Sequence, residues 1–174
     1  MATRLALASV VLFFLIESVA RVLARHMIEP GATVHIAGGL YLANATNSKS
    51  VMAFGLSSLS WLLIALSISC CFLLLFWVAG SFIPQLQGGK AVPFGIVSGS
   101  LVVAVILINI FETLLIGGVT DYLAWINVEA GTARIVNLAD VVLILSLFLV
   151  MASYLMVLVV LTKVAAANLI RVVQ

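Results

Sequence analysis

Long apolar runs alternate with shorter polar stretches along the chain, and four of these runs are long enough to cross a bilayer. They cover roughly residues 5–24, 61–83, 94–116 and 141–162. Each is close to the ~20 residues that a membrane-spanning helix requires. Lipid offers no partners for backbone groups, and the sequence has no series of short alternating strands typical of a barrel. The pattern therefore predicts four transmembrane helices.

The first apolar run begins almost at the N-terminus, where a cleavable signal sequence is the alternative. The residues that follow its most apolar part include Glu17, Arg21 and Arg25. Charges in these positions are unlike a cleavage region of small residues. We therefore expect the run to be retained as the first transmembrane helix.

The connectors between the apolar runs differ in length and pattern. Residues 84–92 join the second and third runs through a short stretch containing Gly and Pro, as expected for a tight helix–helix turn. The first connector, residues 25–58, is much longer and has two partly alternating pieces around Gly38 and Gly39, which predicts a small hairpin. Because the hairpin is apolar, it should lie on the bilayer surface or cover a site. An ordinary ordered loop is the alternative.

These patterns predict an all-α membrane protein of four transmembrane helices, with a small β-rich connector between the first and second helices. The composition agrees, because 65% of the residues are apolar and 8% are charged, whereas soluble domains are about half apolar and a quarter charged. We expect residues 1–174 to form a single integral membrane domain surrounded by bilayer lipids. The net charge of +2 and the lack of a basic patch argue against a nucleic-acid partner.

Carboxylates are concentrated in one part of this weakly charged chain. Residues 109–140 hold four of its six acidic side chains. With four alternating spans, all six acids fall toward the side of the two longer connectors. The lysine and arginine residues divide evenly, four to each side, so positive charge does not fix the orientation.

Polar residues near the ends of three predicted helices have the spacing of neighbours on one helix face. The pairs are Glu17 with Arg21, Asn109 with Glu112, and Asn137 with Asp140. Alternating topology brings these helix ends to the same membrane surface, and Asp121 follows the third helix closely. An ionisable group in a membrane segment costs about 2.5–3.5 kcal/mol on insertion scales, so a functional role is expected. Helix capping by Asn137 or Asp140 is the alternative.

Two neighbouring carboxylates can hydrolyse an amide bond without a metal or a covalent intermediate. Since both cannot easily ionise at close range, they share a proton. One then takes a proton from water, and the other protonates the leaving nitrogen. A metal site would require histidine or cysteine ligands nearby, but His26 and His35 lie in the first connector without ligand spacing. No serine-nucleophile or phosphate-loop motif accompanies the acids.

The acidic segment resembles the lipoprotein signal peptidase, or type II signal peptidase, family of bacteria. That family carries Asn-x-x-Asp-Arg, three further residues, Gly-x-Val-x-Asp, a loop and then Phe-Asn-x-Ala-Asp. The residues in this register are Asn109, Glu112, Gly117, Val119 and Asp121, followed by Val136, Asn137, Ala139 and Asp140. The first block keeps its spacing without a gap, which makes the match specific.

Weaker similarities extend over most of the remaining chain. The family's first helix ends in Asp-x-x-x-Lys, and Glu17 and Arg21 have the same charges at the same spacing. Its first connector ends in a motif like Asn-x-Gly-x-Ala-Phe. The corresponding residues here are Lys49, Val51, Ala53 and Phe54. Asn47 lies nearby and takes the place of the motif's Asn if the loop is shifted.

The resemblance implies that Asp121 and Asp140 are the catalytic residues of an intramembrane aspartyl endopeptidase. The residues implied to support the site are Asn109, Glu112, Asn137, Glu17 and Arg21, and those implied to bind substrate are Asn47, Lys49 and Phe54. The implied reaction removes the signal peptide from a diacylglyceryl-modified prolipoprotein, before its lipidated cysteine. No cofactor or metal is implied. We expect a monomer in the bacterial plasma membrane, with prolipoprotein substrates as partners and the site facing the extracytoplasmic surface.

Departures from the family pattern keep other functions open. Glu112 replaces Asp, Thr113 replaces Arg and Val51 replaces Gly. One alternative is therefore a catalytically weak or inactive paralogue that binds lipidated or helical partners as a membrane subunit. A small transporter or proton channel is a further alternative, although it would need polar groups throughout the bilayer depth.

Overall fold

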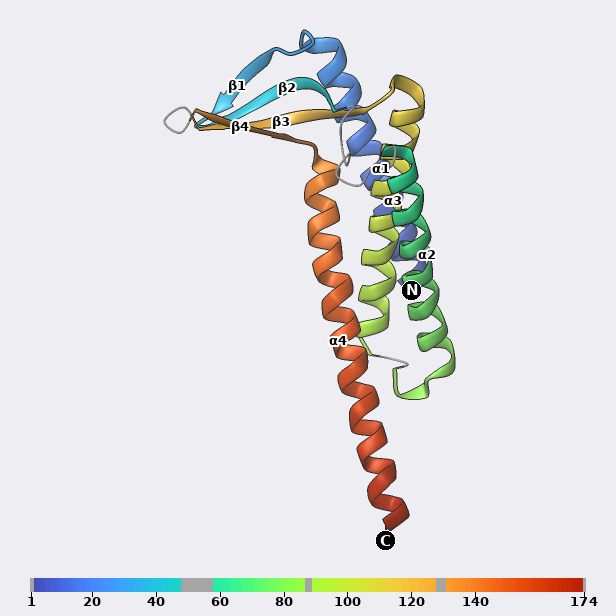
Figure 1. The fold of residues 1–174 in the computed structure, drawn as a ribbon. Coiled ribbons are helices and arrows are strands. Elements are labelled where there is room, and N and C mark those ends of the chain that lie inside the picture. The colour runs from blue at the N-terminus through green and yellow to red at the C-terminus, as the bar shows by residue number, and fades with distance from the viewer. Residues whose placement is uncertain (1, 48–57, 87–88, 128–130, 174) are drawn as a thin grey trace.

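Four long helices form a bundle, and a small sheet projects from one end of it (Figure 1). The computed structural model describes residues 2–47, 58–86, 89–127 and 131–173. The helices are α1 (Ala2–Met27), α2 (Ser58–Phe82), α3 (Ala91–Ile116) and α4 (Leu138–Val173). All four are long and apolar enough to cross a membrane, which confirms the predicted spans.

The helices alternate in direction, so that their ends gather in two groups (Figure 1). The C-terminal ends of α1 and α3 lie with the N-terminal end of α4 beside the sheet. The short helix η2 (Pro84–Leu86) and the turn from α2 to α3 lie at the opposite end, and α4 extends beyond that turn. The three helix ends that carry the predicted polar pairs therefore meet at one end of the bundle, as expected.

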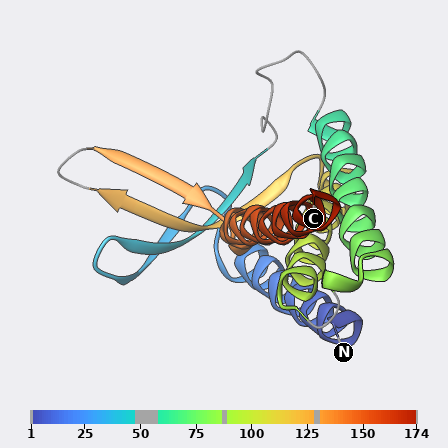
Figure 2. The same cartoon turned by 90° about the horizontal axis from the view of Figure 1, so that it is seen from below.

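α3 is the central helix, because it packs against each of the other three (Figure 2). In the most apolar stretch of each helix, 56% of the α3 residues are buried, compared with at most 22% in the other helices. Gly95 and Gly99 lie four residues apart and let α2 approach closely. A Cβ on Gly95 would lie 2.6 Å from the ring of Phe76, and one on Gly99 would lie 2.8 Å from Leu73. Small residues at this spacing are typical of tightly packed membrane helices.

The sheet is built from two connectors rather than one. β1 (Thr33–Ala37) and β2 (Leu40–Asn47) form the hairpin predicted in the first connector. β3 (Val119–Asn127) and β4 (Thr132–Val136) extend the β structure to the connector between α3 and α4, where the sequence analysis places no strands. The four strands are antiparallel in the order β1-β2-β3-β4. The first hairpin therefore pairs with the segment that carries Asp121.

Two consecutive glycines turn the chain from α3 directly into β3. Gly117 adopts a left-handed conformation with φ 78° at the C-terminal end of α3, which glycine adopts without steric cost. Gly118 packs against the end of β2, where a Cβ would lie 3.0 Å from the backbone oxygen of Asn47. This turn places Asp121 beside the end of α3 and beside Asn47.

Gly95→Ala tests the close approach of α2 and α3. Alanine is favoured over glycine in a helix by about 1 kcal/mol, so the substitution would stabilise an open site. Because the new methyl group overlaps the ring of Phe76, we expect a net loss of about 1–3 kcal/mol, measured as a lower melting temperature in detergent micelles. Combining Gly95→Ala with Phe76→Leu should cost less than the sum of the two single changes. A higher melting temperature for Gly95→Ala would contradict the packing.

Candidate active site

A buried guanidinium lies at the centre of the polar residues at the sheet end of the bundle. Arg21 is 2% exposed. It donates hydrogen bonds to Glu17 Oε1 at 2.7 Å, to Asn109 Oδ1 at 2.8 Å and to Glu112 Oε2. Glu17 and Glu112 are also buried. Since an unpaired buried charge costs several kcal/mol, Arg21 holds α1 and α3 together through two carboxylates that need its charge.

Glu112 connects this charge cluster to β3. Its Oε1 accepts a hydrogen bond from the hydroxyl of Thr120 at 2.6 Å, and its Oε2 accepts one from the backbone N–H of Thr120 at 3.0 Å. A second guanidinium, that of Arg25 in α1, lies 3.4 Å from Glu112 Oε1. The start of β3 is thus fixed against the ends of α1 and α3, immediately before Asp121.

Asp121 is buried and held by two side-chain amides. Its Oδ1 accepts a hydrogen bond from Asn137 Nδ2 at 2.7 Å, and its Oδ2 accepts one from Asn47 Nδ2 at 3.3 Å. Burial raises the pKa of Asp121 above its usual value, and the negative charge of Asp140 raises it further. The amides of Asn137 and Asn47 and the charge of Arg21 oppose this increase without cancelling it.

Asn137 and Asp140 form a reciprocal capping box at the start of α4. The Oδ1 atom of Asn137 accepts a hydrogen bond from the backbone N–H of Asp140 at 2.9 Å, and Oδ2 of Asp140 accepts one from the backbone N–H of Asn137 at 3.2 Å. This is the geometry of an N-cap residue and the third residue of a helix. The capping alternative considered from the sequence is therefore correct as a description of both residues.

Capping and contact with Asp121 are made by the same side chain. Asn137 uses its Oδ1 atom for the cap and its Nδ2 atom for Asp121. Asp140 is half-buried, and among the described residues its Oδ1 atom has no hydrogen-bond partner. Asn137 thus contacts both carboxyl groups, that of Asp121 in β3 through its side-chain amide and that of Asp140 in α4 through its backbone N–H, while an oxygen of Asp140 stays available.

The structure brings most of the predicted site residues to this junction. Those that meet there are Glu17, Arg21, Asn109, Glu112, Asp121, Asn137 and Asp140. Asn47 reaches Asp121 from the end of β2. Lys49 and Phe54 lie outside the described residues, as does Val51. The roles of these residues in catalysis and substrate binding remain predictions.

Thr120 and Tyr122 belong to the cluster although the sequence analysis does not single them out. The hydroxyl of Tyr122 donates a hydrogen bond to Glu17 Oε2 at 2.6 Å and accepts one from the backbone N–H of Leu138 at 3.1 Å. Residues 119–127 are rich in β-branched and aromatic residues, which is typical of a strand. A strand predicted there would have placed Thr120 and Tyr122 on one face, next to the end of the third helix.

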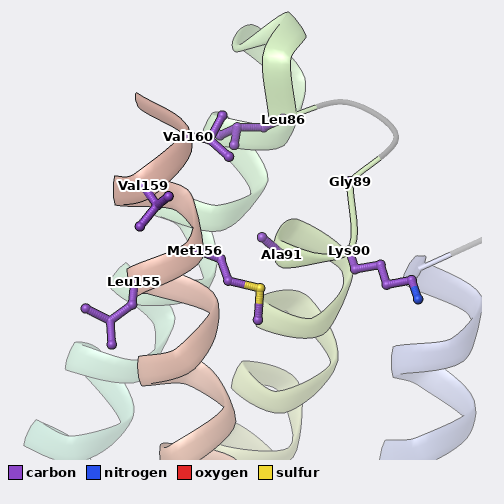
Figure 3. Close-up of a pocket in the computed structure, with 8 residues that line it drawn as sticks. All are labelled: Leu86, Gly89, Lys90, Ala91, Leu155, Met156, Val159 and Val160. Atoms are coloured by element: carbon purple, nitrogen blue, oxygen red, sulfur yellow. The ribbon is translucent and has the colours of Figure 1, made fainter. Parts of the chain in front are cut away.

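Two apolar hollows of similar size lie outside the charge cluster. One of about 420 Å³ lies at the other end of the bundle, between the start of α3 and α4 (Figure 3). Lys90 is the only charged residue among the eight that line this hollow, and none of the eight is a carboxylate. The other hollow, of about 410 Å³, lies between the end of α1 and the first hairpin, and Tyr122 forms part of its wall. The second hollow therefore adjoins the cluster, whereas the first does not.

Arg21→Met tests the electrostatic role of the guanidinium. Methionine keeps much of the side-chain volume but leaves the buried Glu17 without a counter-charge and Glu112 with only the partly exposed Arg25. We therefore expect a loss of about 3–5 kcal/mol, measured by thermal unfolding in detergent. Arg134→Met, at an exposed position in β4, is the matched control and should change stability by less than about 0.5 kcal/mol. Neutralising all three charges with Glu17→Gln, Arg21→Met and Glu112→Gln should recover part of the loss. Equal stability of the Arg21 variant and the parent would contradict the account.

Comparison with known proteins identifies the family of this chain. A family model described as signal peptidase (SPase) II matches residues 9–156. Two solved structures, described as bacterial membrane enzymes determined by the in meso method at 2.3 and 1.9 Å resolution, have the same fold. The first has a TM-score of 0.60 and 20% identity over 88% of this chain and 87% of its own. The second has a TM-score of 0.59 and 22% identity over 88% and 92%. No curated protein sequence matches. Since the family match covers most of the chain, including the cluster from Glu17 to Asp140, the chain belongs to the signal peptidase II family.

Proposed function

We propose that this protein is an aspartyl endopeptidase that removes the signal peptide from diacylglyceryl-modified prolipoproteins, cutting before the lipidated cysteine. Its family processes lipoprotein signal peptides and is of the aspartic peptidase type. One observation carries the assignment to particular residues. Asn137 donates a hydrogen bond from its side-chain amide to the Asp121 carboxylate and one from its backbone N–H to the Asp140 carboxylate, so one residue holds two carboxyl groups from different elements.

Different environments of the two aspartates support different roles. Asp121 is the more deeply buried, and its pKa is raised, so it holds the shared proton. Asp140 takes a proton from a water molecule, and the oxygen of that water attacks the scissile carbonyl carbon. Asp121 hydrogen-bonds the carbonyl oxygen. The proton taken up by the pair passes to the leaving nitrogen as the C–N bond breaks, so the two carboxyl groups end in their initial protonation states.

The apolar hollow beside Tyr122 supports a lipid-bearing substrate. Its volume of about 410 Å³ is within the ~300–1,000 Å³ typical of small-ligand sites. Its walls combine the end of α1 with Val34 and Leu42 of the first hairpin, so it connects the lipid-facing surface of α1 to the sheet. We assign this hollow to an apolar part of the substrate, next to the proposed dyad at the extracytoplasmic surface of the bacterial plasma membrane.

A non-catalytic paralogue that only binds lipidated partners is the second candidate. Thr113 favours it, because the family's Arg is missing there and the buried Thr113 hydroxyl has no partner among the described residues. The charge is supplied from elsewhere, however, since Arg25 of α1 lies 3.4 Å from Glu112. Complementation of a bacterial strain that lacks its own type II signal peptidase separates the two candidates. Growth supports the peptidase, and failure at normal expression supports the paralogue.

Asp121→Asn and Asp140→Asn test the proposed dyad directly. Each change removes the acid–base function of one carboxyl group with little change in shape. We expect each to reduce cleavage of a diacylglyceryl-modified prolipoprotein by the purified protein about 10³-fold, while the protein still inserts and unfolds at a similar temperature. Glu29→Gln, at an exposed position after α1, is the matched control and should cleave at the parental rate. Normal processing by either aspartate variant would refute the assignment.

Asn47→Ala tests the electrostatic environment of Asp121. The Asn47 amide stabilises the ionised form of Asp121 and lowers its pKa, so its removal should raise that pKa. If Asp121 holds the catalytic proton, the alkaline limb of the kcat/KM profile should move upward by a few tenths of a pH unit. Thr46→Val, in the neighbouring exposed position, should leave the profile unchanged. A downward shift for Asn47→Ala would contradict the assignment of the proton to Asp121.

A further inference from the structure

Tyr122 connects the two elements that carry the proposed catalytic aspartates. It directly follows Asp121 in β3, and its hydroxyl contacts Leu138, two residues before Asp140. The side chain is 5% exposed. The residue next to Asp121 therefore contacts the start of α4, the helix that carries Asp140, through its hydroxyl group.

The hydroxyl makes two hydrogen bonds of different kinds. It accepts one from the backbone N–H of Leu138 at 3.1 Å and donates one to Glu17 Oε2 at 2.6 Å. Leu138 is the first residue of α4, so its N–H has no acceptor within the helix. Glu17 is fixed in turn by its pair with Arg21. The bonds thus form a chain from the charge pair in α1, through β3, to the start of α4.

We propose that Tyr122 is a positioning residue, whose hydroxyl holds the start of α4, and with it Asp140, in its place beside Asp121. The proposal rests on the proposed function for the two aspartates. The capping box fixes Asp140 relative to α4, but it does not fix α4 relative to β3. The pairing of β4 with β3 ends at Val136. Beyond it, two hydrogen bonds join β3 to the start of α4, from the Asn137 amide to Asp121 and from the Leu138 N–H to the Tyr122 hydroxyl.

The Tyr122 hydroxyl keeps its proton throughout the working pH range. Burial raises the pKa of Tyr122 strongly, and the hydrogen bond and negative charge of Glu17 raise it further. The charged residues that act on it are Glu17 and Arg21 of α1, and the positive charge of Arg21 opposes the increase without cancelling it. The donor to Glu17 is therefore present whenever the aspartates can react.

Tyr122→Phe removes the hydroxyl and keeps the ring, which lines the apolar hollow with α1. We expect kcat for prolipoprotein cleavage to fall about tenfold, because Asp140 is held less firmly against Asp121, with KM changed less than about twofold. When Asp140 lies farther from Asp121, its negative charge raises the pKa of Asp121 less. The alkaline limb of the pH–rate profile should therefore move to lower pH. If the role of Tyr122 is purely structural, the melting temperature should fall while the pH dependence of kcat stays the same. Tyr41→Phe, on the same sheet, is the matched control.

Leu138→Pro removes the other half of the same hydrogen bond. Proline is well tolerated at the first position of a helix, because its missing N–H needs no partner there. The variant lacks the donor to Tyr122 but keeps the capping box and the bond from Tyr122 to Glu17. We expect kcat to fall about as much as in Tyr122→Phe, and the double variant to be no slower than either single variant. Leu138→Ala, which keeps the N–H, is the control for the lost side chain. A multiplicative loss of about a hundredfold in the double variant would overturn the proposal.

Hydrogen exchange provides a readout that does not depend on activity. In Tyr122→Phe the backbone N–H of Leu138 should exchange about five times faster, because it loses its acceptor, whereas the middle of α4 should exchange at the parental rate. If the parent protein cleaves no prolipoprotein, the proposed function fails, and accelerated exchange still shows that the hydroxyl holds α4. Unchanged exchange at the start of α4 together with unchanged kcat in Tyr122→Phe would overturn the positioning role itself.

Discussion

The polar end of this membrane protein depends on one buried positive charge. Arg21 donates to carboxylates from two different helices, in surroundings where neither carboxylate could remain ionised alone. The three charges therefore fix how α1 is rotated relative to α3. The contacts that join these two helices to β3 follow from that rotation. Glu17 then points toward Tyr122, and Glu112 receives both hydrogen bonds of Thr120, which sets the position of β3.

The length of apolar runs was enough to predict the four helices, because lipid leaves helical hydrogen bonding as the only solution for each run. The first hairpin could also be predicted, since its glycines lie between two apolar pieces. β3 and β4 were not predicted, because the sheet that contains them is completed by β2, from a connector more than 70 residues earlier. Pairing of this kind depends on tertiary structure, which local pattern does not contain.

Helical spacing predicted which polar residues would share a face, and the structure brings these pairs together. The spacing of Asn137 and Asp140 indicated either a cap or a catalytic group, and the two readings turn out to be compatible, since Asn137 uses one atom for each contact. Tyr122 was beyond such reasoning. Its hydroxyl joins Glu17, 105 residues away in the chain, to a backbone group of α4. A tyrosine in an apolar stretch gives no local indication of such partners.

The pairing of β2 with β3 also has a consequence for biosynthesis. β2 leaves the ribosome long before β3, so one edge of β2 lacks a strand partner until β3 has been made. Until α3 and the segment that follows it have been synthesised, Asn47 has no Asp121 to bind and the sheet is half built. The hairpin of β3 and β4 thus completes a sheet begun by the first connector, and Asp121 meets both Asn47 and Asn137 only after the start of α4 has been made.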